Sequence, residues 1–174
     1  MKKFPVVVDM QKDFVDGALG SPEAVAIVPA VVKKIRGFDS EIFVTFDTHG
    51  ENYMQSQEGR FLPVPHCIKG RKGWELDKKV ARALKDREYT AVEKPTFGSL
   101  TLPKLIKKAA GRGKFSVEVI GLCTDICVVS NALIIKAAFP EMPVSVDSSC
   151  CAGVTPAKHE AALETMRSCQ ITVN

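Results

Sequence analysis

Three side chains able to do acid–base or nucleophilic chemistry each follow a short apolar stretch of this chain. Asp9 and Lys94 come directly after such stretches, and Cys127 comes after a short turn. The stretches cover residues 4–8, 89–93 and 117–121. Open α/β sheets bind ligands at the carboxyl ends of their parallel strands. If the stretches are such strands, a carboxylate, an ammonium and a thiol meet at one sheet edge, as nucleophilic catalysis requires.

The surroundings of Cys127 are compatible with a reactive thiol. The segment 119–127 reads as a strand end, a tight turn at Gly121 and the first turn of an apolar helix. Free amides and the positive helix end there lower a thiol pKa and can hold an oxyanion. A small buried cysteine is the alternative, and the local pattern does not decide between the two. Likewise, Asp9 could cap a turn, and Lys94 could be a surface lysine.

A second set of side chains is suited to a metal. Asp47 and His49 lie two residues apart after the apolar stretch 42–46, so in an extended segment they point to the same side. His66 adds a second imidazole from the same region of the chain. Two imidazoles and one carboxylate can hold a divalent ion and leave positions open for a ligand. We expect the third histidine, His159, to face solvent from an amphipathic helix.

The elements expected to position these residues alternate between strands and helices. Helical periodicity covers residues 22–36, 74–84, 102–110, 126–139 and 156–168, and a last short strand is expected at 170–173. This alternation predicts a three-layer α/β/α sandwich with a central, mainly parallel sheet, formed by residues 1–174 as one domain. Asp147 follows the apolar stretch 144–146 and is expected at the same sheet edge as Asp9. The region 48–73 is long for a loop, which is typical of functional loops.

Composition and charge exclude several classes of function. The net charge of +4 comes from 24 basic and 20 acidic residues, and the basic residues alternate with aliphatic ones at helical spacing. Few aromatic residues accompany them, so we expect solvated helix faces and no nucleic-acid partner. No apolar stretch is long enough for a membrane span. The six cysteines lack the spacing of a disulfide framework, which indicates a reducing compartment and hence the cytoplasm.

Three motifs together resemble those of the isochorismatase-like cysteine hydrolases, and among these the nicotinamidases. They are VVDMQKDF at 7–14, VEKPTF at 92–97 and GLCTDICV at 121–128. The resemblance implies a Rossmann-like α/β fold and a triad in which Asp9 is the base, Lys94 the cation and Cys127 the nucleophile. It also implies a cis peptide between Leu122 and Cys123. The oxyanion hole would be formed by the backbone N–H groups of Cys123 and Cys127.

The same resemblance implies a metal, a substrate and an assembly. Asp47, His49 and His66 match the nicotinamidase metal site, which implies Zn²⁺, with Mn²⁺ or Fe²⁺ as alternatives. Phe14 matches an aromatic residue of the substrate pocket, and Gln11 in the same motif is assigned to that pocket. Isochorismatases proper lack the cysteine, so its presence favours hydrolysis of a small amide, with nicotinamide first, through a thioester. Family members commonly form homo-oligomers, and we expect one here.

Two departures from the nicotinamidase pattern leave the substrate open. Thr48 stands where those enzymes usually have a tryptophan, and Pro63 stands where another tryptophan packs on the pyridine ring. Phe61 could take over that packing. A carbamoyl, ureido or aliphatic amide substrate is therefore the first alternative. A non-catalytic metal-binding or thiol-redox protein is the second, but it leaves the placement of Asp9 and Lys94 unexplained.

Overall fold

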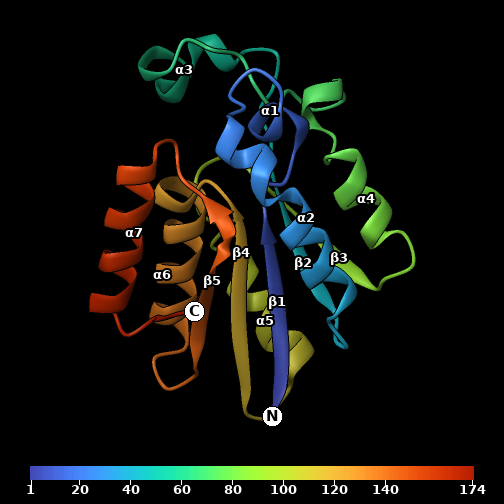
Figure 1. Cartoon of the computed structure of the whole chain (residues 1–174), viewed down its shortest axis with the longest axis vertical. Coiled ribbons are helices and arrows are strands. Elements are labelled where there is room, and N and C mark those ends of the chain that lie inside the picture. The colour runs from blue at the N-terminus through green and yellow to red at the C-terminus, as the bar shows by residue number, and fades with distance from the viewer.

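The computed structural model describes residues 1–174 and has a parallel β-sheet at its centre (Figure 1). Six strands lie in the order β3-β2-β1-β4-β5-β6, and every adjacent pair is parallel. The strands are β1 (Lys2–Val8), β2 (Ile42–Asp47), β3 (Tyr89–Lys94), β4 (Phe115–Leu122), β5 (Val144–Ala152) and β6 (Thr172–Val173). The predicted α/β class and parallel sheet are confirmed.

Helices cover both faces of this sheet. One face packs against α1 (Lys12–Val15), α2 (Pro22–Arg36) and α4 (Lys78–Leu84), and the other against α5 (Leu102–Ala110), α6 (Val129–Ala138) and α7 (Pro156–Ser168). Each layer of helices forms a hydrophobic core with the face of the sheet that it covers. Side chains of β1 alternate between these cores: Val7 packs on the side of α1, α2 and α4, and Val6 and Val8 pack on the side of α5, α6 and α7. None of the helices is long and apolar enough to cross a membrane.

The helices predicted at 22–36, 102–110 and 156–168 are present with the same bounds, whereas the other helices differ from the prediction. The predicted helix 74–84 is shorter, because Asp77 caps α4 by accepting hydrogen bonds from the N–H groups of Lys79 and Val80. The predicted helix 126–139 is a π-helical turn, Thr124–Val128, followed by α6. Short helices with too few residues for periodicity were not predicted, among them α1 and α3 (Gln57–Phe61).

The chain changes direction across the sheet at β1, which lies between β2 and β4. From β1 the chain continues to β2 and β3 on one side and returns to β4 on the other side. Such a switch point opens a crevice at the strand carboxyl ends, where ligands bind. Gly121 lets β4 approach β1 closely there, since a Cβ at this position would lie 2.1 Å from the Val8 carbonyl oxygen. In Figure 1, α1 and α3 lie beyond this end of the strands.

Candidate active site

The structure brings Asp9, Lys94 and Cys127 together in one buried group at the crevice. Lys94 Nζ lies 2.6 Å from Asp9 Oδ2 and 3.5 Å from Cys127 Sγ. All three residues are buried. Asp9 follows β1, Lys94 ends β3, and Cys127 follows β4 in the π-helical turn. Because β2 separates β3 from β1, only a long side chain such as that of Lys94 reaches the other two.

Thr45 holds the Asp9 carboxylate in place. The Thr45 hydroxyl donates a 2.6 Å hydrogen bond to Asp9 Oδ1 and accepts one of 3.2 Å from the Asp9 N–H. Asp9 Oδ2 forms the ion pair with Lys94 but accepts no hydrogen bond of normal geometry, which leaves a lone pair for another proton. Asp9 has a φ of 46°, in the left-handed region that few residues other than glycine adopt. The sequence signal for Thr45 is only a polar residue inside an apolar strand.

Burial dominates the titration of this group. It raises the pKa of the Asp9 carboxyl, although the Lys94 ammonium opposes the change. It raises the pKa of the Cys127 thiol as well, and the charge of Asp9 adds to that effect, so the lowered thiol pKa expected from the sequence is not found. Burial alone would lower the pKa of Lys94, but Asp9, Cys127 and Asp47 outweigh it and raise that pKa. Lys94 therefore stays a cation, and Asp9 is a stronger base than an exposed carboxylate.

The turn that carries Cys127 also presents a free backbone donor. The peptide between Leu122 and Cys123 is cis, as the resemblance implies. The N–H of Cys123 donates to no backbone carbonyl, so it is available to another acceptor. His159 does not face solvent as predicted, because α7 packs against this turn and His159 Nδ1 shares a hydrogen bond with the Thr124 hydroxyl.

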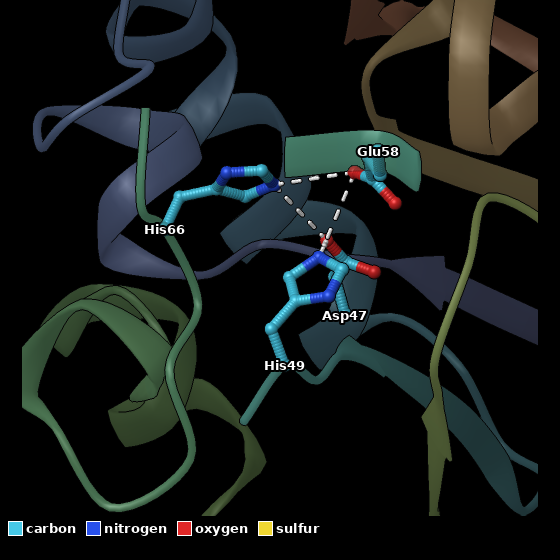
Figure 2. A group of neighbouring side chains, drawn as sticks. All are labelled: Asp47, His49, Glu58 and His66. Carbon is cyan, nitrogen blue, oxygen red and sulfur yellow. Dashed lines mark hydrogen bonds and ion pairs between the residues drawn. The ribbon is translucent and has the colours of Figure 1, made fainter. Parts of the chain in front are cut away.

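Four side chains beside the triad converge on one point (Figure 2). Their ligand atoms, from Asp47, His49, Glu58 and His66, all lie within 4.8 Å of one another. His49 Nε2 lies 3.0 Å from Asp47 Oδ2 and 3.6 Å from Glu58 Oε1. His66 Nε2 lies 3.5 Å and 3.7 Å from the same two atoms. Two imidazoles and two carboxylates in this arrangement fit a divalent metal ion.

Contacts with neighbouring groups orient His66 and Asp47 of this set. The Nδ1–H of His66 donates to the Val64 carbonyl at 2.8 Å, which leaves Nε2 as the ligand atom. Asp47 joins the two groups, since its Oδ1 lies 3.3 Å from Lys94 Nζ while its Oδ2 meets the histidines. No cysteine belongs to the set, so thiolate-bound zinc has no basis here. Glu58 was not predicted; it comes from α3, and its only signal is an acid between two histidines.

A small cavity of about 50 Å³ opens beside Cys127. Its lining is mainly apolar and consists of Phe14, Leu19, Asp47, Glu58, Leu62, His66, Phe97, Cys123, Ile126 and Cys127. Phe14, which was assigned to the substrate pocket from the sequence, is part of this lining. Phe61 is not, because it ends α3 with 84% of its surface exposed, and Leu62 contributes to the wall in its place.

Gln11 is also outside the cavity lining. Its side-chain amide donates to the carbonyls of Asp47 and Trp74, at 2.9 Å each, and accepts from the Asp47 N–H at 2.8 Å. These bonds use both N–H donors of the fully buried Gln11 side chain and fix the backbone of Asp47. The assignment of Gln11 to the pocket is therefore corrected to a role in holding Asp47.

Asp147 does not join the site either. The sequence placed it at a strand end, but β5 continues to Ala152 and Asp147 lies within the strand. Its carboxylate pairs with Lys34 at 2.6 Å, and both residues line a separate groove that also contains Glu118. The pattern of an apolar stretch followed by an acid therefore marks a strand end at Asp9 but not at Asp147.

Comparison with known sequences identifies relatives of this chain. The family model described as the isochorismatase domain matches residues 5–174. A protein of Bacillus subtilis strain 168, described as an uncharacterized isochorismatase family protein and named PncA, is 31% identical over 144 residues. That match covers 76% of this chain and 78% of the relative.

Solved structures of the same fold are also similar. A nicotinamidase/pyrazinamidase PncA from Bacillus subtilis superposes with a TM-score of 0.87 and 24% identity, covering 99% of each chain. A pyrazinamidase of Pyrococcus horikoshii in complex with zinc gives a TM-score of 0.80 and 29% identity, covering 100% of this chain and 99% of the other. The arrangement of strands and helices described above is therefore that of these hydrolases.

Proposed function

The chain belongs to the isochorismatase family, and from this premise we propose that it is a cysteine amidohydrolase that converts nicotinamide to nicotinate and ammonia. The observation that carries the proposal is one buried ammonium, Lys94, in contact with both the Asp9 carboxylate and the Cys127 thiol. Neither a packing cysteine nor a redox dithiol needs this arrangement. The nicotinamidase and pyrazinamidase structures of similar fold support the same reading.

The first half of the proposed reaction forms a thioester. The Asp9 carboxylate takes the proton of the Cys127 thiol, and the sulfur attacks the amide carbonyl carbon. Backbone N–H groups of Cys123 and Cys127 stabilise the oxyanion that forms. Asp9 then gives its proton to the amide nitrogen, the C–N bond breaks, and ammonia leaves. Lys94 holds Asp9 and the sulfur in place and stabilises negative charge on either one.

The second half hydrolyses the thioester. Asp9, again a carboxylate, takes a proton from a water molecule, whose oxygen attacks the thioester carbonyl carbon. The C–S bond breaks, Cys127 recovers its proton from Asp9, and the product leaves as the carboxylic acid, which gives its remaining proton to solvent. The raised pKa of Asp9 suits it to accept and return a proton in both halves.

The metal group would fix the orientation of the substrate. The zinc complex of the Pyrococcus structure supports Zn²⁺ as the ion for Asp47, His49, Glu58 and His66. An ion held there would act as a Lewis acid toward a lone pair of the substrate, such as that of a ring nitrogen. The cavity walls contain Phe14 and Phe97 and no lysine or arginine, which suits a neutral ring.

The main competitor is a carbamoyl, ureido or aliphatic amide substrate of the same chemistry. The aliphatic walls formed by Leu19 and Leu62, with no tryptophan in the lining, favour it. Propionamide and N-carbamoylglycine represent a neutral aliphatic amide and a ureido acid, and both are therefore tested.

The test is ammonia release by the purified protein from nicotinamide, propionamide and N-carbamoylglycine. We expect the highest kcat/KM with nicotinamide, and Cys127→Ala to lower it by about 10³-fold or more. Cys169→Ala, at an exposed cysteine, is the matched control and should retain full activity. A higher kcat/KM for propionamide than for nicotinamide would contradict the proposed substrate. Activity of Cys127→Ala near that of the wild type would contradict the assignment of Cys127 as the nucleophile.

A further inference from the structure

His159 takes no part in the triad or the metal group, yet it contacts the segment that carries the nucleophile. Its Nδ1 and the Thr124 hydroxyl share a hydrogen bond of 2.8 Å. Thr124 is fully buried, and the side chain of His159 is 17% exposed, so water competes little for this bond. Thr124 directly follows Cys123, whose free N–H is a proposed oxyanion donor. We call residues 123–128 the nucleophile turn.

A second contact joins the nucleophile turn to the loop before α7. Asp125 Oδ1 accepts a 2.9 Å hydrogen bond from the Val154 N–H. The loop comes so near that a Cβ at Gly153 would lie 2.9 Å from Asp125 Oδ1 and 2.8 Å from the His159 backbone nitrogen. Residues 153–159 therefore hold the turn at two successive positions, between Cys123 and the nucleophile.

We propose that His159 is a positioning residue that, through Thr124, fixes the oxyanion donors and the thiol of the nucleophile turn. The proposal rests on the proposed function, since it assumes that an oxyanion forms there. Donors of this kind act on charge that develops only in the transition state. A loosened turn should therefore lower kcat and leave KM nearly unchanged. A contact that only stabilises the fold would lower the melting temperature and leave kcat of the folded protein unchanged.

Four substitutions separate the hydrogen bond from the shape of the two side chains. Thr124→Val and His159→Leu remove it, whereas Thr124→Ser and His159→Asn keep a polar group near its position. We expect kcat to fall at least about tenfold in the first pair with KM within about twofold, since small displacements of reacting groups are costly. The second pair should stay within about threefold of the wild type.

Two controls accompany these variants. Thr165→Val changes an exposed threonine of α7 that bonds only to the Ala161 carbonyl, and it should leave kcat unchanged. The double variant of Thr124→Val and His159→Leu should lose no more kcat than the worse single variant, because both remove the same bond. Additive losses would show that the two side chains act separately, which contradicts the proposal.

A readout that needs no turnover is amide hydrogen exchange of the peptide containing the nucleophile turn. Exchange should be faster in Thr124→Val and His159→Leu than in the wild type, and unchanged in Thr124→Ser and Thr165→Val. If the wild type hydrolyses no amide, the proposed function fails, and exchange alone decides whether the contact holds the turn. If the wild type is active, unchanged kcat in Thr124→Val and His159→Leu overturns the proposal, and so does unchanged exchange.

Discussion

Two lysines packed against the sheet, Lys94 at the end of β3 and Lys34 in α2, make nearly the same contacts but differ in burial. Lys94 Nζ is 2.6 Å from the Asp9 carboxylate, and Lys34 Nζ is 2.6 Å from the Asp147 carboxylate. Each lysine also meets a second carboxylate at slightly longer distance, 3.3 Å for Lys94 and 3.2 Å for Lys34. By charge pattern alone, the two groups are equivalent.

Burial and direct contact with a thiol distinguish the two groups. The Lys94 side chain is 1% exposed, and its Nζ lies 3.5 Å from Cys127 Sγ. The Lys34 side chain is 30% exposed and lies in an open groove that Ser149 and Cys150 also line, but it makes no hydrogen bond to the Cys150 thiol. In a dry site the same charges act more strongly on a neighbouring group than they do near water. The two groups therefore differ in burial and in direct contact with a thiol, and not in their charges.

The largest difference between the two groups is expected in the activity of variants in which each lysine is replaced by methionine. Lys94→Met removes the cation that holds Asp9 and Cys127, and we expect kcat/KM for ammonia release to fall at least about 10²-fold. Lys34→Met is the matched control and should stay within about twofold of the wild type, since it touches no group of the triad. Equal losses in initial-rate measurements would contradict the difference between the two groups.

Asp47 belongs to both the lysine group and the metal group, and removing a histidine separates these roles. His66→Ala leaves the Lys94 contact intact but removes a ligand atom, so bound divalent metal should fall at least about tenfold. KM should rise more than kcat falls, because the ion is proposed to anchor the substrate. Metal analysis after dialysis measures the loss, and Glu51→Ala, at an exposed acid of the same loop, is the control. Unchanged metal content in His66→Ala would contradict the assignment of this site.

The second lysine group should matter for stability rather than turnover. Lys34→Met leaves buried Glu118 with only the more exposed Lys3, 3.4 Å away, as a partner. We expect the free energy of unfolding in urea to fall by about 1–2 kcal/mol, less than for a fully buried pair. Adding Glu118→Gln should recover part of this loss, since it removes a buried charge that only Lys3 still compensates. A double variant less stable than Lys34→Met alone would contradict that explanation.

The smallest expected effect is the pH dependence of the stability that the Lys34–Asp147 ion pair contributes. Burial alone would raise the pKa of Asp147, but hydrogen bonds from Lys34 and Ser149 lower it below its ordinary value of 3.8. A lowered carboxyl pKa stabilises the folded state above the ordinary value, and this contribution is lost as the pH falls through the folded-state value. The stability difference between the wild type and Lys34→Met should thus be present at pH 7 and shrink below pH 3.8. Urea unfolding across that range measures it, and a constant difference would contradict the pairing.

The strand ends explain why the triad could be predicted from the sequence. Asp9, Lys94 and Cys127 follow apolar stretches, and a parallel sheet brings the ends of such stretches to one edge. Asp147 has the same local pattern, but its strand continues, because pairing with β4 resumes beyond a register shift and no local residue signals this. The length of β5 is decided by its neighbour and not by its own sequence.

The loop side of the site could be predicted only in part. His49 and His66 stand out because histidines are few, but Glu58 and Leu62 owe their positions to α3, a helix too short to leave a periodic pattern. Phe61 and Leu62 are adjacent and both apolar, so composition cannot tell which one faces the cavity. In the structure Phe61 is 84% exposed, whereas Leu62 is 37% exposed and contributes to the cavity lining.

The most direct test of the account is to look for the acyl group on the protein during turnover. Wild-type protein mixed with nicotinamide and quenched in acid within the first turnover should show, by peptide mass spectrometry, a nicotinoyl thioester on Cys127 that hydroxylamine removes. Lys94→Met should accumulate much less of it in the same time, and Lys34→Met should match the wild type. Rapid ammonia release with no adduct, or an adduct on another residue, would contradict the account.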